Sequence, residues 1–142
     1  MNRYLAMIGA LAIALGLISN ASLVVAHHSG TMYDRSKTMT IRGTVLELRW
    51  VNPHVSVLVK GIADGGKTEA EEWLMEMTSP GNLVRVSGWS RNAVKAGDEV
   101  IVEFFPLRDT SLRGGALKKV TIVATGKVYT AEMSAQEMPG LE

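Results

Sequence analysis

Residues 40–50 read TIRGTVLELRW and predict a long first strand. Alternate residues of a strand share one face. The apolar positions of the first half share one face: Ile41, Gly43 and Val45. Those of the second half share the opposite face: Leu46, Leu48 and Trp50. Such a change of phase indicates a β-bulge or a sharp coil between Gly43 and Leu46. The strand is therefore expected to belong to a strongly curved sheet.

Two more strands follow with the same alternation. Asn52-Pro53 interrupts the first strand because proline has no N–H to donate. The second strand places Val55, Val57 and Val59 on one face, and His54 and Ser56 on the other. After a turn over residues 63–67, a third strand over residues 71–77 carries three large side chains on one side: Trp73, Met75 and Met77.

One helix and two strands complete the predicted domain. Ser79 is a candidate N-cap, Pro80 suits the first helical position, and Gly88 ends the helix. A fourth strand is predicted over residues 99–105 and a fifth over residues 117–125, with Gly114-Gly115 as a hairpin turn. The sequence thus predicts an all-β domain, mainly β with one short helix, folded as a five-stranded OB-fold-like barrel. An up-and-down β-sandwich is the competing architecture.

The N-terminus predicts export. Of the first 26 residues only Arg3 is charged, and an apolar run extends from Leu5 to Ile18. This run is short for a bilayer span of about 20 residues, so a signal peptide is preferred over a membrane anchor. Cleavage is expected after Ala26, with Ala21 as the alternative. The expected location is the bacterial periplasm or the medium.

The predicted organisation has four parts: a signal peptide over residues 1–26, an N-terminal arm over 27–38, the barrel over 39–126 and a polar, mobile tail over 127–142. The chain has no cysteine, so no disulfide supports the fold. Lys and Arg total 15 and Asp and Glu 14. This balance gives no reason to expect a nucleic-acid partner.

The histidines are candidate ligands of copper or a similar metal. After cleavage at Ala26, His27 offers both its α-amine and its imidazole, a pair of nitrogen donors that suits Cu(II). His28 and His54 supply further imidazoles. The alternative is a metal-free domain, in which His27 and His28 belong to a frayed terminus and His54 is an ordinary surface residue.

A softer metal site is also conceivable from Trp73, Met75 and Met77, because thioethers suit Cu(I). Core packing is the simpler interpretation of this alternation. With His54 upstream, the set resembles the periplasmic copper- and silver-binding chaperone of the Cus efflux system, an exported five-stranded barrel. Here Trp73 stands two residues before the first methionine, where that family has three.

A closer resemblance is to a small exported bacterial family known only as a domain of unknown function. It rests on His27-His28-Ser29, on the segment Trp50-Val51-Asn52-Pro53-His54, and on shorter matches at Arg42–Val45, Ser79-Pro80, Gly88-Trp89 and Lys95–Asp98. The resemblance implies no substrate, cofactor or activity. It does support the histidines and the Trp50–His54 segment as functional candidates.

Four residues are candidates for contact with an organic ligand or partner protein: Trp50, Asn52, Arg85 and Trp89. No nucleophile elbow or recognisable acid pair is present, so a hydrolase is not expected. The sequence therefore predicts a non-enzymatic exported binding module with a copper-type site. The alternatives are a metal-free domain that binds a partner or a small ligand, and a copper-dependent oxygenase with an N-terminal histidine brace.

Overall fold

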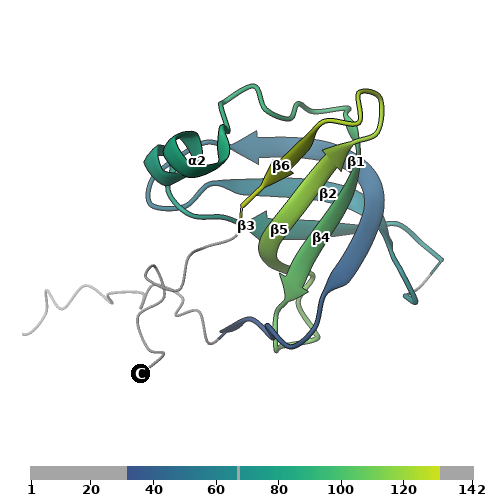
Figure 1. Cartoon of the computed structure of the whole chain (residues 1–142). Helices are drawn as coiled ribbons and strands as arrows, with labels where there is room; N and C mark the ends of the chain where they lie inside the picture. Colours follow the sequence, from purple (N-terminus) through teal and green to yellow (C-terminus); the bar gives the residue numbers. More distant parts are fainter. Residues whose placement is uncertain (1–31, 67, 132–142) are drawn as a thin grey trace, which may run out of the picture.

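The computed structural model describes residues 32–66 and 68–131, which form a mainly β structure with one short helix (Figure 1). The elements in chain order are β1 (Met39–Arg49), β2 (Ser56–Ala63), β3 (Glu71–Glu76), α2 (Pro80–Ser87), β4 (Glu99–Pro106), β5 (Gly114–Ile122) and β6 (Val128–Thr130). The predicted signal peptide and its two cleavage sites lie outside the described residues.

The first five strands close into a barrel. They lie in the order β3-β2-β1-β4-β5, and every neighbouring pair is antiparallel. β5 then returns to pair with β3 in parallel, through Leu74–Glu76 and Gly114–Ala116. Because this pairing joins the two ends of the sheet, the five-stranded barrel is confirmed and the sandwich is excluded. The strand order, with the helix between β3 and β4, is that of an OB-like barrel.

The bend predicted in the first strand is present. The pairing of β1 with β2 shifts between Val45 and Glu47, so Leu46 is the extra residue of a bulge. A bulge increases local twist and bends the strand. As a result, β1 pairs with β4 in its first half and with β2 along its length, which allows one strand to serve two walls of the barrel.

The predicted inward-facing residues form the core. Val55, Val57 and Val59 have no exposed surface. Burying a valine side chain stabilises a fold by about 1.5–3 kcal/mol relative to leaving it exposed. The same cluster includes Ile41 and Val45 from β1 and reaches Leu83 of α2. The alternation read from the sequence therefore separates inside from outside along β1 and β2.

The helix begins and ends where its capping residues predict. The Ser79 side chain accepts a hydrogen bond from the Asn82 backbone N–H at 3.4 Å, and Pro80 occupies the first turn. Gly88 ends the helix in the left-handed conformation, with φ of 66°. Figure 1 shows α2 beside the barrel, on the side where β1 and β3 end. Across the two described ranges, no helix has the length and apolar character that a bilayer crossing requires.

Two predictions near the C-terminus are wrong. Gly114 and Gly115 begin β5 and do not form a hairpin turn. They are needed for close approach, because a Cβ would lie 2.4 Å from the Leu74 carbonyl oxygen at Gly114 and 2.2 Å from that of Phe105 at Gly115. A sixth strand, β6, extends the sheet beside β5 (Figure 1), so the mobile tail expected over residues 127–142 is wrong for residues 127–131, and the rest of it lies outside the described residues. Its Tyr129 side chain is buried.

Candidate functional site

The described part of the N-terminal arm, residues 32–38, is hydrogen-bonded to the end of β4 and the residues that follow it. The Asp34 N–H donates to the Pro106 carbonyl at 2.8 Å, and the Arg108 N–H donates to the Met32 carbonyl at 2.8 Å. Between these bonds, Tyr33 forms a β-bridge with Leu107. The arm therefore continues the sheet for a short distance, and Tyr33 is only 5% exposed.

Tyr33 also links the arm to β3. Its hydroxyl donates a hydrogen bond to the carboxylate of Glu76. Burial holds the pKa of Tyr33 far above its ordinary value, and the hydrogen bond to Glu76 and the negative charge of Glu76 act in the same direction. The charge of Arg35 opposes them weakly. The phenol is therefore a neutral hydrogen-bond donor near neutral pH.

A cavity of about 250 Å³ lies beside this pair. It occupies the junction where β3 meets β5, under the arm and the β4–β5 loop. Its apolar walls come from four residues of three segments: Met32, Leu74, Leu107 and Leu112. Tyr33 and Glu76 form its polar side, and Arg113 and the Gly114-Gly115 backbone complete the lining. This cavity is therefore an apolar hollow with a carboxylate in its wall.

Arg113, on the rim of this cavity, donates hydrogen bonds to two neighbouring residues of the protein. Its Nε donates to a Glu71 carboxylate oxygen at 2.9 Å, and its Nη1 donates to the Thr110 carbonyl at 2.8 Å. Its guanidinium also lies 5.6 Å from the centre of the Trp73 ring. These contacts fix the guanidinium at the β3 edge, where its charge is paired with Glu71.

His54 lies on the outer face that also carries Glu76. Ser56 of β2 is the register partner of Glu76, and Leu58 is the partner of Leu74. His54 precedes Ser56 by two residues, and alternation places it opposite the buried Val55. Val55 still exchanges backbone hydrogen bonds with Thr78 and Met77, so the pairing continues to the residue after His54, and alternation predicts His54 on the same face as Glu76.

Of the four predicted ligand-contact residues, Trp89 is buried, Trp50 is partly buried, and Asn52 and Arg85 are exposed. Trp89 is in the core, and its indole N–H donates to the Thr130 carbonyl at 2.7 Å. Trp50 is partly buried and packs against the core. Asn52 is exposed in the β1–β2 connection, and Arg85 is exposed on α2, where it donates to Asn82 at 2.9 Å. No common ligand surface joins Trp89 to the exposed members of this set.

The residues predicted for a soft metal site are packed in the core. Trp73 is 7% exposed, Met75 is fully buried and Met77 is 1% exposed. Trp73 packs against Phe104, with ring centres 5.8 Å apart. These contacts agree with the simpler interpretation of the alternation, namely that the three side chains fill the barrel.

The histidine site is only partly within the described residues. His54 is half-buried, two residues before β2, whereas His27 and His28 lie outside the described ranges. Within those ranges, no three residues of the types His, Cys, Asp and Glu gather closely enough to hold a metal.

Sequence reasoning missed the Tyr33–Glu76 pair and the cavity. Tyr33 stands in a polar segment, MYDRSK, where a lone large aromatic was the available signal that the arm packs on the barrel. Glu76 follows the inward-facing Met75 and points outward. Nothing local to either residue indicates a partner 43 positions away.

One protein family matches the chain, described as "Family of unknown function (DUF6152)", over residues 14–116. The matched range contains the arm, the strands β1 to β4 and the start of β5. No curated protein matches the chain. No solved structure matches it either.

Proposed function

Since the chain belongs to the DUF6152 family of unknown function, we propose from its own residues that it is an exported, non-enzymatic binding module that holds a copper-type ion through His27, His28 and His54. Export is supported by the apolar run from Leu5 to Ile18 and by the small residues that precede His27. Cleavage after Ala26 would give His27 the free amine that the chelate needs.

The hydrogen bond from Tyr33 to Glu76 carries this proposal. It anchors the arm at the end of β3, the strand that pairs with β2, and His54 precedes β2 by two residues. His27 precedes Tyr33 by six residues. A chain of this length spans at most about 20 Å, and the diagonal spacing on a sheet is about 7–8 Å. The N-terminal nitrogen donors are therefore within reach of the His54 imidazole.

The donor set suits a borderline divalent ion. An amine and neutral imidazoles are the ligands that Cu(II) prefers among nitrogen and oxygen donors. A folded barrel that already fixes His54 and the arm lowers the conformational entropy lost on binding. The ligands must be deprotonated, so the affinity is expected to fall as the pH is lowered through the titration range of histidine.

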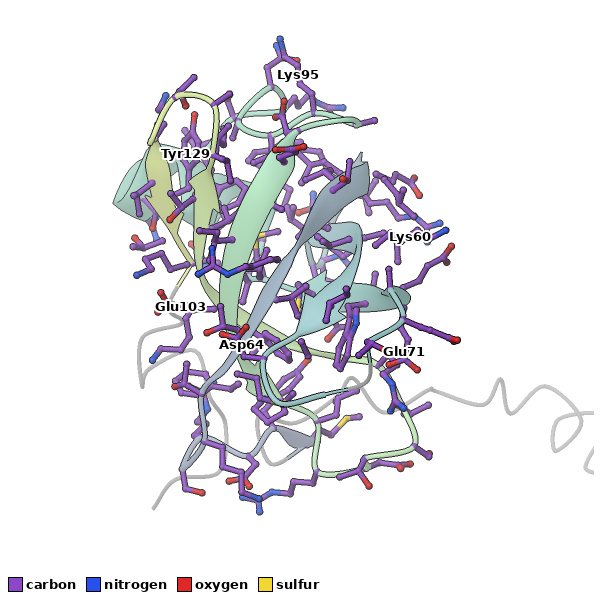
Figure 2. All side chains as sticks on the ribbon, turned by 90° about the vertical axis from the view of Figure 1, so that its right-hand side faces the viewer. Lys60, Asp64, Glu71, Lys95, Glu103 and Tyr129 are labelled. Carbon is purple, nitrogen blue, oxygen red and sulfur yellow. The ribbon has the colours of Figure 1, made fainter. Side chains whose placement is uncertain are left out.

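The test is a Cu(II) titration of the mature protein, with its N-terminus at His27 verified by intact mass. One ion per chain is expected, with a dissociation constant below about 10 µM, a level that isolated histidines could reach. His54→Ala should weaken binding by about tenfold or more. Lys60→Ala is the matched control, because Lys60 lies on the same face of β2 and projects outward from the barrel (Figure 2).

A second variant separates the amine from the imidazoles. One alanine added before His27 removes the amine from the chelate and should weaken binding while leaving every side chain in place. Equal affinity in the extended chain, in His54→Ala and in the unmodified mature protein would contradict the proposal. Turnover of the copper-loaded protein with a reductant and oxygen would instead favour the histidine-brace oxygenase.

A further inference from the structure

We propose that the cavity between the N-terminal arm, β3 and the β4–β5 loop is a binding site for a small apolar molecule, of the size of one ring with a short substituent, that carries one hydrogen-bond donor. The site is separate from the proposed metal chelate, because its argument uses neither His54 nor the residues before Met32. It rests on the volume of the cavity, its apolar walls and the single carboxylate in its lining.

The volume sets the size of the ligand. A closed apolar cavity of about 150 Å³ takes benzene, and sites for drug-sized ligands begin near 300 Å³. The cavity here measures about 250 Å³. It therefore accommodates a benzyl-sized molecule and is too small for a nucleotide or an oligosaccharide.

The walls of the cavity indicate that most of the ligand is apolar. Leu74 is 40% exposed and Leu112 is 53% exposed, and both line the hollow together with Met32 and Leu107. These leucines come from β3 and from the β4–β5 loop, which are different parts of the barrel. A ligand that covers them would remove apolar surface from water, at about 25 cal/mol per Å².

The carboxylate sets the polar group of the ligand. The Tyr33 hydroxyl already donates a hydrogen bond to one oxygen of Glu76. Among the described residues, the other oxygen of Glu76 has no hydrogen-bond partner that would occupy it. An ionised carboxylate only accepts hydrogen bonds. A hydroxyl or ammonium group on the ligand would satisfy this oxygen, whereas a carboxylate on the ligand would face a like charge.

Two cations near the cavity do not change this preference. Arg113 is paired with Glu71 and donates to Thr110. Arg35 lies with its guanidinium carbon 5.2 Å from the centre of the Phe105 ring, on the β4 side of the arm. Neither contacts Glu76 by an ion pair within the described ranges. Glu76 is therefore the group that a ligand in the cavity meets.

Four probes test the proposal on the full mature chain: benzyl alcohol, benzylamine, toluene and benzoate. Each is titrated to concentrations of about 1–10 mM, the range expected of ligands with so few atoms, while amide and methyl resonances are followed by NMR. The two donor probes should shift Leu74, Leu112 and the Gly114 amide. They should bind at least about fivefold tighter than benzoate, with toluene between them.

Variants locate the site. Leu112→Glu places a charge in the apolar wall and should weaken the donor probes at least about tenfold. Val123→Glu is the matched control, because Val123 is 50% exposed and lies beyond β5, outside the cavity lining. Glu76→Gln keeps the shape and should reduce the preference for benzylamine over benzoate.

Three results would overturn the inference: no shifts at Leu74, Leu112 and Gly114 with either donor probe, benzoate binding as tightly as benzylamine, or unchanged binding in Leu112→Glu. A failed copper titration would leave these NMR results unaffected. The cavity and the proposed metal site are therefore judged separately.

Discussion

The hydroxyl of Tyr33 donates a hydrogen bond to the carboxylate of Glu76, which lies 43 positions further along the chain. This bond holds the arm against β3 at the point where the barrel closes. It also gives the candidate cavity its polar side and brings the arm to the face that carries His54. The metal proposal and the cavity proposal both depend on this placement of the arm.

Replacing Tyr33 with phenylalanine should loosen the arm without removing its aromatic packing. The variant loses a hydrogen bond to a charged acceptor, which lowers the free energy of unfolding by about 1.5–3 kcal/mol. Urea denaturation measures this change. Tyr129→Phe is the matched control: Tyr129 is 8% exposed, and among the described residues its hydroxyl has no hydrogen bond. An equal loss in both variants would contradict the role given to Glu76.

The raised pKa of Tyr33 predicts a loss of stability in alkali. The folded state holds the proton more tightly than the unfolded state, whose tyrosine pKa is about 10. The contribution of Tyr33 is therefore fully present below pH 10 and is lost as the pH rises above it. Unfolding free energies measured from pH 8 to 11.5 should fall more steeply for the wild-type protein than for Tyr33→Phe. If the unfolding free energies of the two proteins fall in parallel with pH, folding does not raise the pKa of Tyr33 and the prediction is wrong.

Removing the N-cap of α2 should destabilise the domain modestly. Ser79→Ala deletes the acceptor for the Asn82 N–H and should cost about 1 kcal/mol. Ser79→Asp keeps a cap acceptor and should retain most of the stability. Thermal unfolding of the three proteins measures the effect. If Ser79→Asp is as unstable as Ser79→Ala, the cap is not the cause.

Adding a methyl group at Gly115, where β5 lies against β4, should lower the stability of the protein. In Gly115→Ala, the new Cβ would stand 2.2 Å from the Phe105 carbonyl oxygen, so β4 and β5 must move apart. We expect a loss of about 1–3 kcal/mol from this overpacking. Gly81→Ala is the control: nothing lies within 4 Å of its new Cβ. Because Gly81 is helical, that change should stabilise the protein by about 0.5–1 kcal/mol. Denaturant unfolding should thus move the two variants in opposite directions.

Local signals were sufficient for most of the fold. Strand alternation identified Val55, Val57 and Val59 as core, since alternate residues necessarily share a face. The change of phase in residues 40–50 predicted a bulge or coil between Gly43 and Leu46, and the strand register places the bulge at Leu46. Ser79 and Gly88 marked the ends of α2 because capping depends on a few neighbouring residues. Each of these features is decided within a short stretch of chain.

Other features depend on distant strands coming together. Gly114 and Gly115 resemble a turn in sequence, yet they lie in β5. These strand positions are glycine because the carbonyls of Leu74 and Phe105 leave no room for a side chain. β6 is a short strand whose edge is supplied by β5 and whose Tyr129 packs against Trp89, with ring centres 5.1 Å apart. A segment of three residues has too little pattern to be recognised alone.

The candidate site shows the same division. Local sequence predicts which residues face inward and where the chain bends. The contact between Tyr33 and Glu76 and the cavity between the arm and Leu112 depend on the tertiary structure. The reason is physical: the periodicity of a strand depends on its own backbone, whereas contacts across the barrel depend on strand register and closure, to which every strand contributes.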